Sequence, residues 1–466
     1  MRRNEFIVAF ALGALMVLPL SACGGYAATT EPIRNALSAG RPQDGLEKVD
    51  DALDVPTDQD IPLKIKEETS LLLLERGTIL HGLADYPGSS RDLQVAEKHL
   101  ELLDLQNDTA GDIGKWLFSD TATVYKAPAY EKLLLNTMNM MNYLARGNLE
   151  DARVEARRLT TMQEYLKNEE SEQKALLGLG SYLAGFTFEM SGRPDEAIRY
   201  YDEALAHEDY PSLHVPVARL ANQVSYRTDR IETVLQKTGG PVQAASAGAR
   251  PATGTLLVIP EVGLVPHKEA MRIPIGAALV IAGAVIYGPG LSSSQRAQAG
   301  RLAAKGLLMW INFPVLKDTP HAYDNAEVAV DGTPVRTETG LEVAQKVKAA
   351  WESIKGTVMV AAIVRMIARA LIAEGTEAAG KGAGAGGVGS LLISLAVEGA
   401  MTAADTPDTR NWATLPARIL ISRHELPPGT HRITVTLSGR GGVKTITKEV
   451  DIPAGGFVVL PVSALR

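Results

Sequence analysis

The fold of the N-terminal half is decided by the stretch Ala184-Gly185-Phe186-Thr187-Phe188, Ser191-Gly192-Arg193-Pro194, Ala197, Tyr201 and Ala204-Leu205. Its small residues, Gly185 and Ala197, allow two consecutive helices to pack closely. Gly192 is placed to end the first helix in the left-handed backbone conformation that glycine adopts without strain. Tyr201 is large enough to fill the space toward a following helix. The stretch therefore predicts a pair of antiparallel helices.

Two earlier segments repeat this pattern clearly, and a third repeats it weakly. The clear repeats are Gly77, Leu80, Ala84-Asp85-Tyr86, Leu93, Ala96 and Met140, Tyr143, Gly147-Asn148-Leu149, Ala152, Ala156, Leu159; the weak one is Ala36-Leu37-Ser38-Ala39-Gly40 with Leu46, Val49, Leu53. The pattern resembles the tetratricopeptide repeat (TPR), whose helix pairs stack into a solenoid. Because the turns are unevenly spaced rather than about 34 residues apart, we expect irregular repeats with insertions.

We therefore predict a TPR-like solenoid of three to four helix pairs, with a plain helical bundle as the alternative. The expected packing positions are Gly77, Tyr86, Ala96, Gly147, Ala152, Gly185, Gly192, Ala197 and Ala204. The insertion with Trp116-Leu117-Phe118, Tyr125, Pro128 and Tyr130 is expected to pack over the array, or else to form a ligand-facing loop.

The N-terminus indicates the compartment. Arg2 and Arg3 precede an apolar run from Phe6 to Leu20, roughly 15 residues, which suits a signal peptide better than a membrane span. The run ends in Leu20-Ser21-Ala22-Cys23, which resembles the lipobox of bacterial lipoproteins. The resemblance implies a lipid on Cys23, with Gly24 favouring the outer membrane and its periplasmic face. An ordinary secretory signal and an uncleaved anchor are the alternatives.

The second half of the chain differs in character from the first. Strands are expected at 254–260, 326–330, 418–423, 431–437, 445–450 and 457–462, with helices at 293–310, 341–374 and 390–404. Residues 431–437 alternate apolar and polar side chains, which predicts a half-buried antiparallel strand. The apolar segment 275–287 is too short to cross a bilayer as a helix. The apolar helices are expected to be buried, with membrane insertion or oligomerisation as the alternative.

These observations predict an α+β chain: an N-terminal all-α TPR-like helical solenoid, then a mixed domain of Gly/Ala-rich helices and a small antiparallel β-module. The expected boundaries are a signal peptide at 1–22, a tether at 23–30, the TPR-like domain at 31–237, a linker at 238–255 and the mixed domain at 256–466.

Composition and motifs exclude several kinds of chemistry. The formal net charge of −7 argues against nucleic-acid binding, and a single cysteine argues against disulfides and Cys-based metal sites. Residues 375–381 match the start of a P-loop but lack its final Ser/Thr, and the glycine motif at 384–389 follows a helix, so we expect no nucleotide. We also expect no cofactor and no metal, and interpret His424 and His431 as exposed residues at strand ends.

The densest polar and aromatic cluster contains Glu398, Asp405, Asp408, Arg410 and Trp412. Arg410 and Trp412 are a possible interface, because Arg and Trp are frequent interface anchors. The alternative is an ion-paired connection between the last helix and the β-module, with Trp412 buried.

Residues 130–133, 142–158 and 405–416 resemble an uncharacterised family of Gram-negative TPR-containing outer-membrane lipoproteins. The resemblance implies an envelope or peptidoglycan-related assembly role and brings no established activity. The predicted function is a non-enzymatic scaffold whose TPR groove binds an envelope protein or peptide. The alternatives are a structural component of a secretion, polysaccharide-export or peptidoglycan-synthesis assembly, and an envelope glycan-acting enzyme with Glu398 and Asp405 as its acids.

Overall fold

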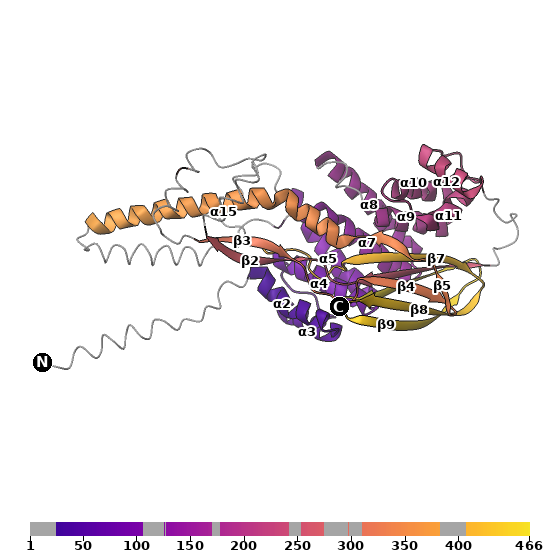
Figure 1. The fold of residues 1–466 in the computed structure, drawn as a ribbon, viewed down its shortest axis with the longest axis horizontal. Helices are drawn as coiled ribbons and strands as arrows, with labels where there is room; N and C mark the ends of the chain where they lie inside the picture. Colours follow the sequence, from indigo (N-terminus) through magenta and orange to yellow (C-terminus); the bar gives the residue numbers. More distant parts are fainter. Residues whose placement is uncertain are drawn as a thin grey trace.

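A computed structural model describes residues 25–105, 127–169, 178–241, 253–274, 310–382 and 407–466, together with Tyr125 and Ala297. The described residues form a mixed α+β fold, as predicted. Helices from the first half lie against a mixed sheet, and a second sheet packs on its far side (Figure 1).

The first half consists of successive helix pairs. Their members are α2 (Gly25–Ser38) with α3 (Pro42–Leu53), α4 (Glu67–Gly82) with α5 (Tyr86–Leu105), α7 (Ala129–Ala145) with α8 (Leu149–Glu169), and α9 (Gly178–Met190) with α10 (Pro194–Leu205). The short helices η3 (Pro211–Leu213), α11 (His214–Leu220) and α12 (Asp229–Thr238) follow. Each pair turns at a residue with positive φ, namely Gly40, Ala84, Gly147 and Gly192. The predicted helix pairs are thus confirmed, including the weak one.

The beginning of the chain differs from the expectation of a tether at 23–30. Residues 25–30 form the first turns of α2, and Tyr26 and Thr30 are buried. Tyr26 is an aromatic side chain with a core position, and its hydroxyl donates to Glu75 Oε1 at 2.9 Å. Burial of Tyr26 therefore holds these residues against the body.

Close contacts between small and large side chains hold each pair together. A Cβ atom at Gly77 would lie 3.0 Å from Leu93 Cδ2, and one at Gly185 would lie 2.4 Å from Tyr201 Cδ1. Ala96, Ala152, Ala197 and Ala204 are also fully buried. The predicted packing positions are therefore confirmed as buried at Gly77, Ala96, Ala152, Gly185, Ala197 and Ala204. Gly147 and Gly192 are instead exposed at the turns, and Tyr86 is half-buried.

We expect Gly185→Ala to lower the free energy of unfolding by about 1–3 kcal/mol, because the added methyl overpacks against the fully buried ring of Tyr201. Urea denaturation of the two proteins measures this loss. Gly192→Ala is the matched control: its Cβ would meet no atom within 4 Å, so only the backbone cost at φ +69° remains, about 1 kcal/mol. An equal loss in both variants would contradict the steric explanation.

The second half forms two four-stranded sheets. The first has the order β10-β1-β7-β6 and the second the order β5-β4-β8-β9. Their strands are β1 (Gly254–Val262), β4 (Asn325–Val330), β5 (Thr333–Val335), β6 (Glu338–Leu341), β7 (Arg418–Leu426), β8 (Gly429–Gly439), β9 (Gly442–Ile452) and β10 (Phe457–Ala464). Every strand expected from the sequence is present. The module is not wholly antiparallel, however, because β10 returns to pair with β1 in parallel.

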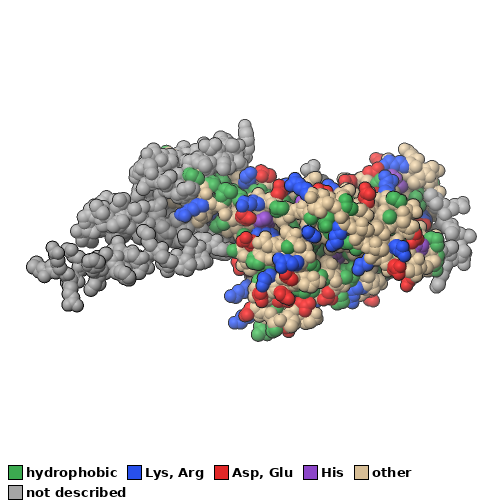
Figure 2. Space-filling view, turned by 60° about the horizontal axis from the view of Figure 1, so that its bottom comes forward, with side chains coloured by type: hydrophobic (Ala, Val, Ile, Leu, Met, Phe, Trp, Pro, Cys, Tyr) green, Lys and Arg blue, Asp and Glu red, His purple; other side chains and the backbone are tan. Residues whose placement is uncertain are grey.

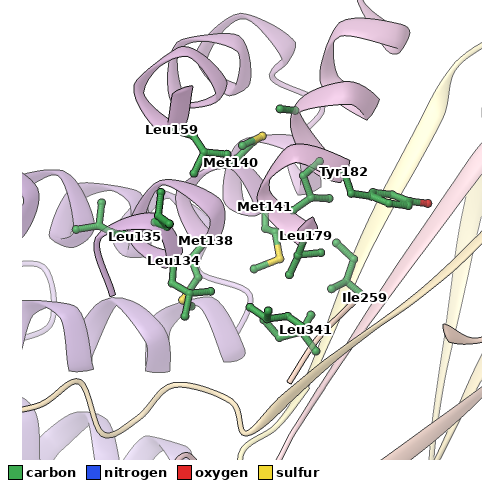
Figure 3. Close-up of a cluster of buried hydrophobic side chains, with 14 of the residues drawn as sticks. Leu134, Leu135, Met138, Met140, Met141, Leu159, Leu179, Tyr182, Ile259 and Leu341 are labelled. Carbon is green, nitrogen blue, oxygen red and sulfur yellow. The ribbon is translucent and has the colours of Figure 1, made fainter. Parts of the chain in front are cut away.

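One hydrophobic core joins the two halves of the chain. On β1, alternate residues Leu257 and Ile259 pack with the helices, whereas Leu256 and Val258 face the second sheet. The strand is therefore buried on both faces, as a strand between two layers must be. Figure 3 shows Met141 and Tyr182 of the helices beside Ile259 of β1 and Leu341 of β6.

An arm extends from this body. It contains the hairpin of β2 (His267–Pro274) and β3 (Trp310–Lys317) and the long helix α15 (Val343–Gly382), which lie side by side in Figure 1. Phe313 of β3 and Trp351 of α15 belong to its own small core, separate from the main one. The helix expected at 293–310 does not include Trp310, which begins β3, and the rest of that range except Ala297 lies outside the described residues. Among the described residues, no helix has the length and apolar character of a membrane span.

Candidate functional site

The inner helices of the array present no free face. Residues 70–81 of α4 and 178–188 of α9 are continuously buried, and so are residues 129–144 of α7 except the half-buried Lys132. The first sheet covers them, with α4 and α7 contacting β10 and α9 contacting β6. The ring of Phe186 meets the ring of Phe457 edge-on at 5.7 Å. The face on which the sequence predicted a partner is therefore occupied by the chain itself.

The segment 408–415, here called the strap, lies across α4 and α7. Trp412 has no exposed surface, and its indole Nε1–H donates to Thr78 Oγ1 at 2.8 Å. The backbone N–H of Trp412 donates to Glu131 Oε1 at 3.1 Å. The strap is therefore held by side chains of two inner helices of the same chain.

Glu75 of α4 is the second carboxylate that holds the strap. Its oxygens accept the backbone N–H groups of Ala413 and Thr414 at 2.9 and 2.8 Å, and the Thr414 hydroxyl at 2.6 Å. Burial raises the pKa of the Glu75 carboxyl, although these donors act in the opposite direction. Such a buried carboxylate depends on its hydrogen bonds, because burying it without them is costly.

The structure corrects the interface predicted at Arg410 and Trp412. Arg410 is 3% exposed, with Nε 2.8 Å from Asp408 Oδ1 and its guanidinium 5.4 Å from the centre of the Tyr125 ring. Both residues therefore bind the strap to the body instead of meeting a partner. The expectation that Tyr125 and Tyr130 pack is confirmed, since their hydroxyls donate to Glu131 at 2.6 and 3.0 Å.

A second polar cluster lies among α5, α7 and α8; we call Glu97, Asn136, Asn139, Glu155 and Arg158 the carboxylate cluster. Asn136 Nδ2 donates to Glu97 Oε1 at 2.7 Å and to Glu155 Oε2 at 3.1 Å, so one amide joins both acids. Asn139 Nδ2 donates to Glu155 Oε1 at 3.0 Å. Arg158 Nη1 lies 2.6 Å from Glu97 but 3.6 Å from Glu155.

The charges of the carboxylate cluster do not balance. The described residues bring one guanidinium, Arg158, to its two buried acids. Burial, and then the charge of Glu97, raise the pKa of Glu155 to about 7. Asn139 is fully buried, and its Oδ1 has no hydrogen-bond partner among the residues that the structure describes. Perturbed acids of this kind are found at functional sites, although structural networks also produce them.

Sequence reasoning did not find Glu75, Glu131 or Glu155. One signal for Glu75 was available, because it directly follows the leucine run 71–74 inside a helix without a polar face. Glu155 lies in a charged helix, where a buried acid looks like any exposed one. Its partners at 97, 136 and 139 come from two other helices, so no local pattern joins them.

Several sequence predictions fall outside the described residues. They include Cys23, Glu398, Asp405, the insertion residues 116–118, and the glycine motif at 384–389. The histidines lie apart: His424 is half-buried at Ser422 Oγ, whereas His431 contacts Asp331 Oδ2 at 2.7 Å. Within the described ranges, no three His, Cys, Asp or Glu side chains are grouped so that they could hold a metal ion.

Acidic and basic side chains are interspersed over the face of the body shown in Figure 2. Two larger apolar side chains of α8, Val154 and Tyr165, are 42% and 37% exposed. A scan of protein-family models and a search of curated proteins find no match to this chain. Its function is therefore argued from the geometry above.

Proposed function

We propose that this chain is a lipid-anchored scaffold on the periplasmic face of the outer membrane, that it is not an enzyme, and that it binds an envelope protein or peptide. The observation that carries the proposal is the series of four helix pairs, each with a left-handed turn. In three of the pairs a glycine of one helix lies against a large side chain of the other, at Gly45–Leu37, Gly77–Leu93 and Gly185–Tyr201. These features support a TPR-like arrangement, and solenoids of that kind serve as binding surfaces. The lipobox-like residues 20–23 support the anchor at Cys23.

Because the first sheet and the strap cover the inner helices, we propose a different place for the partner. A TPR groove receives its ligand on the inner face, but here sheet and strap fill that face. We place the partner on the outward face of the second helices of the pairs, at α8 of the third pair. Val154 and Tyr165 provide exposed apolar area there.

Crosslinking in intact cells, followed by purification of the full chain from membranes, tests this placement. We expect Val154→Arg to reduce recovery of the crosslinked partner at least tenfold, because a charge at an interface centre must be desolvated. Ile354→Arg on the arm is the matched control, since Ile354 is 41% exposed and far along the chain. Unchanged recovery with Val154→Arg would remove the partner from α8.

A structural role in a secretion, polysaccharide-export or peptidoglycan-synthesis assembly is the second candidate. The arm of α15, β2 and β3 favours it, because the arm has a small core of its own and extends from the body. In that case Ile354→Arg, rather than Val154→Arg, would disrupt the crosslinked assembly. The same experiment therefore separates the two functions.

A further inference from the structure

The carboxylate cluster has a local shortage of positive charge. Glu97 and Glu155 are 7% and 1% exposed and share the amide of Asn136. Arg158 satisfies Glu97 at 2.6 Å but is 3.6 Å from Glu155, beyond hydrogen-bond length. A buried carboxylate without a close cation is unstable relative to one that is paired or protonated.

The amide of Asn139 indicates which kind of group the carboxylate cluster lacks. Asn139 Oδ1 is a buried acceptor that finds no partner within the described part of the chain, and the Nδ2 atom of the same amide donates to Glu155 Oε1. A donor that is also positively charged would satisfy the acceptor and offset the excess of negative charge together. Ammonium and guanidinium groups combine these two properties.

A metal ion fits this cluster less well. Hard divalent cations take about six oxygen ligands, whereas here the N–H groups of Asn136, Asn139 and Arg158 already point at the carboxylate oxygens. Asn139 Oδ1 is the one amide oxygen that the described cluster leaves unused.

We propose that the carboxylate cluster is a binding site for a second cationic nitrogen group, an alkylammonium or a guanidinium, which donates to Glu155 and to Asn139 Oδ1. The route in is along Arg158, whose side chain is 47% exposed and already reaches the acids from the surface. The group comes from a free amine or from a basic side chain of another protein. The site does not depend on the scaffold role, because it consists of this chain's own helices.

A proton is the competing occupant. If Glu155 is protonated and the amide of Asn139 is rotated, the two side chains satisfy each other without any ligand. This proton-only state is favoured at low pH and lost at high pH, whereas binding of a cationic group strengthens as Glu155 ionises. The pH dependence of binding therefore distinguishes them.

The test uses the full chain in detergent, with methylguanidinium as the free probe and the peptide Gly-Arg-Gly as the side-chain probe. Saturable shifts of the Asn139 side-chain amide resonances are followed by NMR at pH 6 and pH 8.5. We expect binding at least fivefold tighter at pH 8.5, and at least tenfold weaker in Glu155→Gln. Glu150→Gln, an exposed acid on the same helix, is the matched control and retains binding.

A second variant, Arg158→Gln, is expected to change the affinity for methylguanidinium in the opposite direction. Removing the resident guanidinium leaves both acids unpaired, so we expect it to tighten binding of methylguanidinium at least threefold. Tighter binding of the peptide than of methylguanidinium identifies a protein side chain as the source, and equal binding identifies a free amine. Absence of saturable shifts at pH 8.5, or equal shifts in Glu155→Gln, overturns the site and leaves the proton as its occupant.

Discussion

Trp412→Ala is expected to lower the free energy of unfolding by about 3–5 kcal/mol, the range for removal of a large buried aromatic side chain. Trp412 has no exposed surface and belongs to the core that joins the helices and the first sheet. Its loss leaves a cavity and also leaves Thr78 Oγ1 without its indole donor. Because one core serves both halves, we expect helices and strands to unfold together in urea, at a lower midpoint.

Trp351→Ala is the matched control for this prediction. Trp351 is also buried, at 5% exposed, but it packs against Phe313 in the separate core of the arm. We expect hydrogen exchange to accelerate in β3 and α15 while the helix pairs keep their protection. If Trp412→Ala affected only the strap, or if both variants destabilised the body equally, the idea of a shared core would fail.

Glu155→Gln is expected to stabilise the protein relative to wild type increasingly as pH rises from about 5 to 8. The folded pKa of Glu155 is about 7, above the ordinary value of 4.5 that applies in the unfolded chain. Between these values the folded state keeps a proton that the unfolded state has lost, so the wild type loses stability as pH rises. The full difference corresponds to about 3 kcal/mol.

Glutamine resembles the protonated acid and does not titrate, so the variant escapes this loss. Urea denaturation gives the free energy of unfolding of the variant and of the wild type at pH 5 and at pH 8. Comparing the difference between the two proteins at the two pH values removes any effect of the substitution that does not depend on pH. Glu150 is exposed, so the difference in unfolding free energy between Glu150→Gln and the wild type should not change with pH. A flat difference for Glu155→Gln would mean that Glu155 is ionised in the folded protein at pH 5.

Local patterns predicted the elements of this fold well and their assembly poorly. Gly147 and Gly192 marked their turns because a left-handed residue is needed there, and Ala84 shows that a non-glycine can take the same role. The parallel pairing of β10 with β1 could not be predicted, since strand order depends on contacts between distant segments. For Trp412 the sequence left open an interface anchor and a buried side chain, and its complete burial supports the second.

The first sheet and the strap, which cover the inner helices, contain segments that are synthesised long after those helices. A ribosome releases α4 and α7 long before β10 and the strap, and Trp412 meets Thr78 across 334 residues of chain. Contacts of such long sequence separation form slowly, and apolar helices that wait for them are prone to aggregation. We therefore expect the inner helices of the nascent chain to stay exposed to aggregation until the strap and the last strand have been synthesised.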